Sequence, residues 1–204
     1  MDALPDYELI ELLLFRSLPR GDVKPLAKAL LARFGSLGAV LAAPVEALRT
    51  VPGVGEAAAL DLRLLGEAAV RVGREAVSRR AVISSWDALL AYVKVALANA
   101  PREQFRVLFL DRRNQLIADE VLNEGTVDHA PVYPREVMRR ALELSSSAVI
   151  LVHNHPSGDP TPSLEDKNIT QKLVSACKLV GIRTCDHVII GKDNYYSFVE
   201  NGLI

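Results

Sequence analysis

The sequence HNHPSGDPTPSLED, residues 153–166, holds the most chemically informative side chains of this chain of 204 residues. The six residues before it, SAVILV, are apolar and partly β-branched, which is typical of a buried strand. Because residues two apart on a strand point the same way, His153 and His155 are expected to present their imidazoles together at its end. Three prolines follow, and a helix is expected to begin at Ser163, which places Asp166 in its first turn.

Two imidazoles and one carboxylate are suitable ligands for a zinc ion that keeps a fourth position for water. His153, His155 and Asp166 are therefore candidate metal ligands. Two other interpretations are open at this point. Ser163 and Asp166 fit a capping box that closes the start of a helix, and a pair of histidines after a strand can be surface polar residues. The spacing alone does not separate these interpretations.

Length and composition suit two small domains with a hydrophobic core. Half of the residues are hydrophobic, so low-complexity disorder is not indicated. The 24 basic and 25 acidic residues give a net charge of −1, which neither supports nor excludes contact with DNA. Cys177 and Cys185 have no metal-type spacing and are too few for a disulfide scaffold, so both are expected to be buried thiols.

The first residues give no sign of a targeting or membrane segment. Residues 1–15 carry four acids and lack the basic lead of a signal peptide. Their apolar run at 12–15 is far too short to span a bilayer. We therefore expect a cytoplasmic protein without membrane contact.

The N-terminal part of the sequence is expected to be helical, with one glycine-rich turn. The sequence VPGVG at residues 51–55 stands between two expected helices and resembles a helix-hairpin-helix unit. In such a unit the glycines let the turn approach a phosphate, and N–H groups of the next helix face the anion. Gly53, Gly55 and Arg63 are therefore candidate DNA contacts. The expected helices cover residues 6–15, 23–34, 36–42, 44–49 and 56–76.

The same turn has a purely structural interpretation, in which glycine is needed only for the geometry of a tight turn between helices. Glu56, Ala57 and Ala58 stand where many DNA-binding hairpins carry Lys or Arg, and Arg63 is the nearest base downstream. Any DNA binding is therefore expected to be weak and independent of sequence.

The second half alternates strands and helices, which predicts an α/β domain with a mixed sheet. The domain boundary is expected between residues 80 and 84, giving domains over 1–80 and 84–204. Expected helices cover residues 86–98, 134–144 and 163–180, and expected strands cover 104–110, 116–122, 147–152, 183–190 and 195–199.

The pattern His-x-His-Pro-x6-Ser-x2-Asp resembles the signature of JAMM/MPN+ metallohydrolases. The form HNHPSG is similar to the RadC branch, as are VYPREV at 132–137, CDHVIIG at 185–191 and the Ser-Phe-x5-Leu ending at 197–203. The resemblance covers essentially the whole chain. It implies a mixed-sheet MPN domain of the cytidine-deaminase-like type, preceded by an all-α helix-hairpin-helix domain.

The resemblance also implies how such a site works. Zinc lowers the pKa of a bound water to about 7, and peptide hydrolysis needs a base that moves its proton to the leaving amine. In JAMM enzymes this base is a glutamate at the start of the first core strand, for which Glu103 is the best match; Glu120 and Glu124 are competitors. Ser163 resembles the serine that supports the developing oxyanion.

Three further polar residues near the motif have open roles. Asn154 is expected to point away from the two histidines and to fix the loop by hydrogen bonds. His187 is a spare ligand candidate, and Asp186 could accept a hydrogen bond from a zinc-bound imidazole, although a structural role is preferred for both.

The leading hypothesis is a zinc-dependent peptidase or isopeptidase with an unknown peptide or protein substrate. One alternative is a DNA-binding protein of repair or recombination, in which the MPN domain serves as a scaffold. Another is a metal-dependent nuclease, which a single His-His-Asp site fits less well than a carboxylate-rich two-metal site would. A homodimer is left open.

Overall fold

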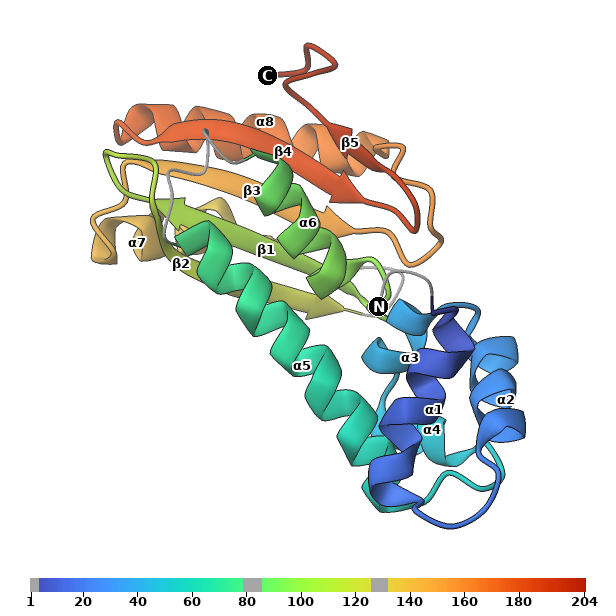
Figure 1. The fold of residues 1–204 in the computed structure, drawn as a ribbon. Helices are drawn as coiled ribbons and strands as arrows, with labels where there is room; N and C mark the ends of the chain where they lie inside the picture. Colours follow the sequence, from blue (N-terminus) through green and yellow to red (C-terminus); the bar gives the residue numbers. More distant parts are fainter. Residues whose placement is uncertain (1–3, 79–85, 126–131) are drawn as a thin grey trace. The chain divides into compact units, whose positions relative to one another are not determined.

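The computed structural model describes residues 4–78, 86–125 and 132–204 (Figure 1). The chain forms two compact units, Met1–Arg71 and Val72–Ile204, which divide within one long helix. The expected boundary between residues 80 and 84 lies outside the described residues. No described helix has the length and apolar character needed to cross a membrane.

The first unit is helical, as the sequence predicts. Its core is made by apolar side chains such as Ile10, Leu30 and Leu48, which are fully buried. Gly35 ends the second helix and connects it to the third, and its φ of 91° lies in the region that favours glycine. The helices are α1 (Asp6–Ser17), α2 (Lys24–Phe34), α3 (Leu37–Ala42), α4 (Val45–Arg49) and the first part of α5 (Glu56–Ser78).

The second unit is built on a five-stranded mixed sheet with the order β2-β1-β3-β4-β5. Strands β3 and β4 are parallel, and the other neighbours are antiparallel. This confirms the expected α/β class. The strands are β1 (Glu103–Leu110), β2 (Leu116–Gly125), β3 (Ala148–Asn154), β4 (Arg183–Ile190) and β5 (Tyr195–Ser197), and the helices are α6 (Trp86–Leu97), α7 (Pro134–Glu143) and α8 (Leu164–Leu179).

Helices cover both faces of this sheet. Residues of α7 and α8 share a buried apolar cluster with alternate residues of β1 and β3, including Phe105, Val107 and Leu151. Helix α6 contacts β3 and β4 from the other face, where Figure 1 shows it in front of the sheet. Because β3 lies inside the sheet with cover on both faces, all seven of its residues are buried, which explains its continuous apolar sequence.

Helix α8 connects the parallel strands β3 and β4, so its first turn lies near the carboxyl end of β3. Ligand sites of open α/β sheets form at this end of the strands. Ser163 is the N-cap of α8, as expected, and both hydrogen bonds of the capping box with Asp166 are present.

Three strands end two or three residues away from the expected position. Strand β3 extends to Asn154 and so includes His153. Strand β2 extends to Gly125 because it pairs with β1 as far as Glu103, through two register shifts. Strand β5 is shorter and ends at Ser197. The next residue, Phe198, donates its backbone N–H to the carbonyl oxygen of His187 at 3.0 Å, and the chain then turns.

Candidate metal centre

Three possible metal ligands converge where β3 ends and α8 begins. His153 is in β3, His155 follows the strand directly, and Asp166 is in the first turn of α8. His153 Nε2 lies 3.0 Å from His155 Nε2 and 3.2 Å from Asp166 Oδ1, and His155 Nε2 lies 3.5 Å from Asp166 Oδ2. These three residues are the only such group among the described parts of the chain.

The donor set and its dimensions fit a tetrahedral zinc ion. Bonds of about 2.0–2.1 Å place tetrahedral ligands about 3.3 Å apart, close to the separations at this site. Two nitrogen lone pairs and a carboxylate repel one another at such distances unless a cation or a shared proton lies between them. Three protein ligands leave one position open, which is the arrangement of a catalytic rather than a structural zinc site.

The capping box and the metal interpretation are compatible. Asp166 Oδ2 accepts hydrogen bonds from the Ser163 backbone N–H at 2.7 Å and from the Ser163 hydroxyl at 2.6 Å. The same carboxylate directs Oδ1 toward His153. Ser163 is exposed, so its hydroxyl lies at the open side of the group. One aspartate can therefore close the helix and offer a metal ligand.

The electrostatics of the group favour positive charge. Burial alone would raise the pKa of Asp166, but hydrogen bonds from His153 and His155 outweigh it and hold this pKa well below its usual range. The hydrogen bond to Asp166 raises the pKa of His155, against the opposite effect of burial. The site is thus prepared to hold a proton or a metal cation.

Each imidazole has a hydrogen-bond partner behind it. His155 Nδ1 lies 2.8 Å from the carbonyl oxygen of Asp159, and His153 Nδ1 lies 2.8 Å from His187 Nε2. Such partners orient metal-binding imidazoles and select their tautomer. His187 is fully buried, and burial lowers its pKa well below the usual value, so the ring is neutral. It stands behind His153 and is not part of the converging group.

Asp186 has a different role from its neighbour in sequence. Its carboxylate accepts hydrogen bonds from the Ser197 hydroxyl at 2.5 Å and from the backbone N–H of Val199 at 3.0 Å. Burial raises the pKa of this carboxyl group. Asp186 therefore fastens the segment after β5 to β4, on the sheet face opposite to His187.

The loop between the ligands is braced by the turn after β4. A Cβ atom at Gly191 would lie 2.5 Å from the carbonyl oxygen of Gly158 and 2.8 Å from Cδ of Pro160. Lys192 donates its backbone N–H to the same Gly158 oxygen at 3.1 Å. Only glycine allows this close approach, which supports the loop that carries the Asp159 carbonyl.

Glu103 lies on the same face of the sheet as the histidines. In the β1–β3 register Phe105 is opposite His153, and the two rings are stacked with centroids 5.9 Å apart. Glu103 precedes Phe105 by two residues and so points to the same side. Its charge also contributes to the raised pKa of His155, which agrees with this proximity.

The other two glutamates are placed differently. Glu120 accepts a bidentate ion pair from Arg140 of α7, at 2.7 Å from Nε and 2.6 Å from Nη2, which lowers the pKa of Glu120. Glu124 is opposite Gln104 in the β1–β2 register, so it points to the face away from Glu103. Glu120, opposite Val107, is on the histidine face but farther along the sheet and bound by Arg140. Of the three candidates, Glu103 is therefore the one that is both on this face and near the end of β3.

The candidate DNA contacts lie in the first unit. Gly53 has a φ of 95° in the turn between α4 and α5, so glycine is needed there for geometry. Gly55 has no positive φ, and a Cβ atom there would meet nothing within 4 Å. Arg63 donates from Nη1 to the carbonyl oxygen of Leu41 at 2.9 Å and so supports the end of α3. The turn geometry thus accounts for Gly53 but not for Gly55.

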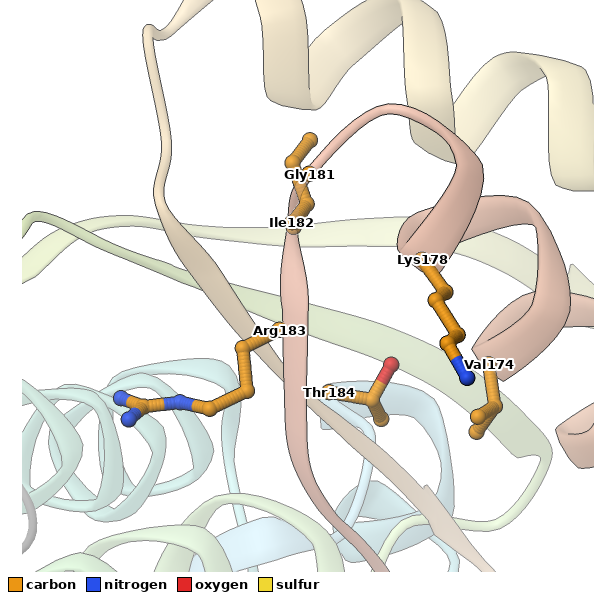
Figure 2. Close-up of a pocket in the computed structure, with 6 residues that line it drawn as sticks. All are labelled: Val174, Lys178, Gly181, Ile182, Arg183 and Thr184. Carbon is orange, nitrogen blue, oxygen red and sulfur yellow. The ribbon is translucent and has the colours of Figure 1, made fainter.

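A pocket of about 390 Å³ lies at the other end of α8 (Figure 2). Lys178 is about 18 Å along the helix from Asp166, at a rise of about 1.5 Å per residue. Figure 2 shows the side chains of Arg183 and Lys178 on opposite sides of β4, so their charges do not converge. The pocket therefore takes no part in the candidate metal centre. Its lining residues are Val174, Lys178, Gly181, Ile182, Arg183 and Thr184.

The mixed five-stranded sheet, with a candidate His-His-Asp metal site at the end of its central strand, is consistent with a domain of the JAB or MPN type. Residues 83–203 match the family model of the RadC-like JAB domain. The chain therefore belongs to the RadC family, as its motifs predict. Because the match begins at residue 83, it leaves the helical unit unassigned, and the helix-hairpin-helix resemblance remains a prediction.

Two relatives resemble nearly the whole chain. The UPF0758 protein of Ruegeria pomeroyi is 59% identical over 202 residues, which cover 99% of this chain and 90% of that protein. The UPF0758 protein of Rhodobacter capsulatus is 58% identical over 203 residues, which cover 100% of this chain and 95% of the relative. The names of these relatives state no activity.

Proposed function

We propose that this protein is a zinc-dependent hydrolase that cleaves peptide or isopeptide bonds. The observation that carries the proposal is the convergence of His153, His155 and Asp166 at the end of β3, with Glu103 on the same face of the sheet. The JAB-type domain supports metal-dependent hydrolysis as the class of reaction.

Zinc, when bound, would lower the pKa of a water molecule and polarise the scissile carbonyl. His153 and His155 would hold the ion through their Nε2 atoms, and Asp166 through Oδ1. Glu103 would accept the proton of the attacking water and return it to the leaving amine. Ser163, at the open side of the site, would release its hydroxyl hydrogen bond to Asp166 Oδ2 and donate instead to the carbonyl oxygen as negative charge develops there.

The surroundings of the histidines support this chemistry. Phe105 stacks on His153, and Phe198 stacks on His187 with ring centroids 4.7 Å apart. His153 is 1% exposed, so its charge interactions are little screened by water. The open side lies toward His155 and Ser163, which are more exposed, and a substrate would enter there.

The proposal is tested with wild-type protein, Glu103→Gln and the matched control Glu124→Gln, each added to a cell proteome whose new peptide ends are then sequenced. Glu103→Gln should keep one zinc per chain, because a base that acts on water is not a ligand, and should lower cleavage by roughly 100- to 10,000-fold. Glu124→Gln should cleave like wild type.

Elemental analysis of each variant provides the second measurement. The double variant His153→Ala with Asp166→Ala should lose stoichiometric zinc. If wild-type, zinc-loaded protein produced no new peptide ends, the peptidase proposal would be wrong. The alternative function, a DNA-associated protein whose MPN domain is a scaffold, would then be favoured. Activity lost with Glu124→Gln instead of Glu103→Gln would move the base to Glu124.

A further inference from the structure

We propose that His187 and Thr170 are positioning residues that set the tautomer of His153, and that they tie this ligand on β3 to the ligand-bearing turn of α8. The inference rests on the proposed metal centre. It concerns two residues of the protein that lie outside the converging group and do not face the open side of the site.

Three hydrogen bonds in series connect the two ligands. His153 Nδ1 lies 2.8 Å from His187 Nε2, and His187 Nδ1 lies 2.5 Å from Thr170 Oγ1. Thr170 Oγ1 donates to the backbone carbonyl oxygen of Asp166 at 2.5 Å. His153 is 1% exposed, and Thr170 and His187 are fully buried, so no water competes for these groups.

The donor and acceptor of each hydrogen bond in this series follow from the last acceptor, the carbonyl oxygen of Asp166. The Asp166 carbonyl can only accept, so it takes the single hydroxyl hydrogen of Thr170. Thr170 Oγ1 must then accept from His187 Nδ1–H, which leaves His187 Nε2 as an acceptor. His153 therefore donates from Nδ1–H. When a metal cation replaces the hydrogen bond between His153 Nε2 and Asp166, the Nε2 lone pair is free to act as a ligand.

Packing restricts rotation of the His153 and His187 rings, so these donors and acceptors cannot easily be exchanged by a ring flip. Phe105 stacks on His153, and Phe198 stacks on His187. The series of hydrogen bonds also joins three elements, because His153 is in β3, His187 in β4 and Thr170 in α8. It therefore holds the spacing between the two ligand-bearing segments as well as the tautomer.

Thr170→Val tests the chain with little change in volume. Without the hydroxyl, His187 Nδ1–H loses its acceptor, and the alternative tautomer would direct an N–H at His153 and move the His153 proton onto Nε2. Zinc affinity should fall roughly 10- to 100-fold, the usual effect of losing such a partner. Thr170→Ser, which keeps a hydroxyl, should stay within about threefold of wild type. Thr184→Val makes the same substitution on β4, away from the chain, and should leave the affinity unchanged.

The measurements are zinc affinity by competition with a chelating indicator and the visible spectrum of the cobalt-loaded protein, both on the full chain. Thermal unfolding of the metal-free variants shows whether a loss of affinity is only a loss of folding. The inference is supported if the Thr170→Val protein melts like wild type but binds zinc more weakly and has an altered cobalt spectrum. Wild-type affinity and spectrum in that variant overturn it.

A direct measurement needs no substitution. Long-range proton–nitrogen NMR of the zinc-loaded wild-type protein should show the His153 proton on Nδ1 and the His187 proton also on Nδ1. A His187 proton on Nε2 overturns the inference even if Thr170→Val fails to fold. If the wild-type chain binds neither zinc nor cobalt, the metal centre itself is wrong. Metal binding without hydrolysis would contradict only the proposed reaction and would be compatible with the hydrogen-bond series from His153 to Asp166.

Discussion

Asn154 lies between the two candidate histidine ligands in sequence, but its side chain forms hydrogen bonds with the neighbouring strand β1. Its Oδ1 accepts from the backbone N–H of Gln104 at 2.9 Å, and its Nδ2 donates to the carbonyl oxygen of Arg102 at 3.1 Å. These are the backbone groups on either side of Glu103. A single buried amide therefore aligns the proposed base with the strand that carries the ligands.

Asn154→Ala should consequently separate metal binding from turnover. The variant leaves two backbone groups without their side-chain partner, which should cost about 1–3 kcal/mol of unfolding free energy. It should retain zinc but lose roughly 10- to 100-fold in cleavage rate, because Glu103 is no longer held in place. Chemical denaturation, elemental analysis and the cleavage assay measure the three effects. Asn168→Ala, on the exposed surface of α8, is the control and should change none of them.

At the scale of elements, the bidentate ion pair between Glu120 and Arg140 joins the edge strand β2 to α7. The pKa of Glu120 is lowered by its hydrogen bond with Arg140, so folding favours the ionised carboxylate. The stabilisation is thus present above the ordinary glutamate pKa of about 4.3 and is lost as the pH falls through the lowered value.

Glu120→Gln should lower the unfolding free energy by roughly 0.5–1 kcal/mol at pH 7, since the pair is only partly exposed but lies at the surface. Denaturation curves at a series of pH values should show the difference from wild type shrinking below about pH 4. A difference that stayed constant down to pH 2 would mean that packing, and not charge, joins these elements. Glu124→Gln, at an exposed position on the same strand, should show no such trend.

Any binding of DNA is expected to depend on the α4–α5 turn. Gly55→Ala adds a methyl group in open space without backbone strain, whereas Gly53→Ala forces a residue into a φ of 95° and disturbs the fold as well. If the turn approaches phosphate, Gly55→Ala should weaken binding, and Glu56→Gln should strengthen it by removing a negative charge from the helix start.

Fluorescence titration of a labelled duplex at several salt concentrations provides the measurement. Binding should be weak, independent of sequence and steeply reduced by salt, while zinc removal should leave it unchanged. An affinity that Gly55→Ala and Glu56→Gln both leave unaltered would assign the turn to packing alone.

At the scale of the molecule, the sheet-bearing unit begins before the family match does. The last turns of α5 belong to it: Val77 is fully buried, and a Cβ atom at Gly73 would lie 3.4 Å from the Tyr92 ring. A fragment of residues 72–204 should therefore fold and bind zinc like the full chain. A fragment of residues 84–204 should be less stable by about 2 kcal/mol, from the lost burial of Val77.

Circular dichroism and zinc titration of the two fragments test this expectation. Equal stability of both would place the end of α5 outside the folding unit. An unfolded longer fragment, under conditions where the whole protein is folded, would instead show that the helical unit completes the core of the sheet.

Local patterns in the sequence were sufficient for much of the fold and for the expected ligand set. The two-residue period of a strand places His153 and His155 on one side, and the capping box places Asp166 in the first turn of the next helix. All of this information lies within residues 147–166, so no long-range pairing was needed to infer it. The family motifs then predicted the JAB-type domain, which the match over residues 83–203 confirms.

The surroundings of the ligands depended on contacts between residues far apart in the chain. Strand register distinguishes Glu103 from Glu124, because a shift of one residue would exchange the two faces of the strand. His187 and Thr170 meet His153 only after α8 has crossed the sheet and β4 has paired with β3. Sequence patterns specify which way a side chain points within its own element. The partner that it meets is set by the packing of one element against another.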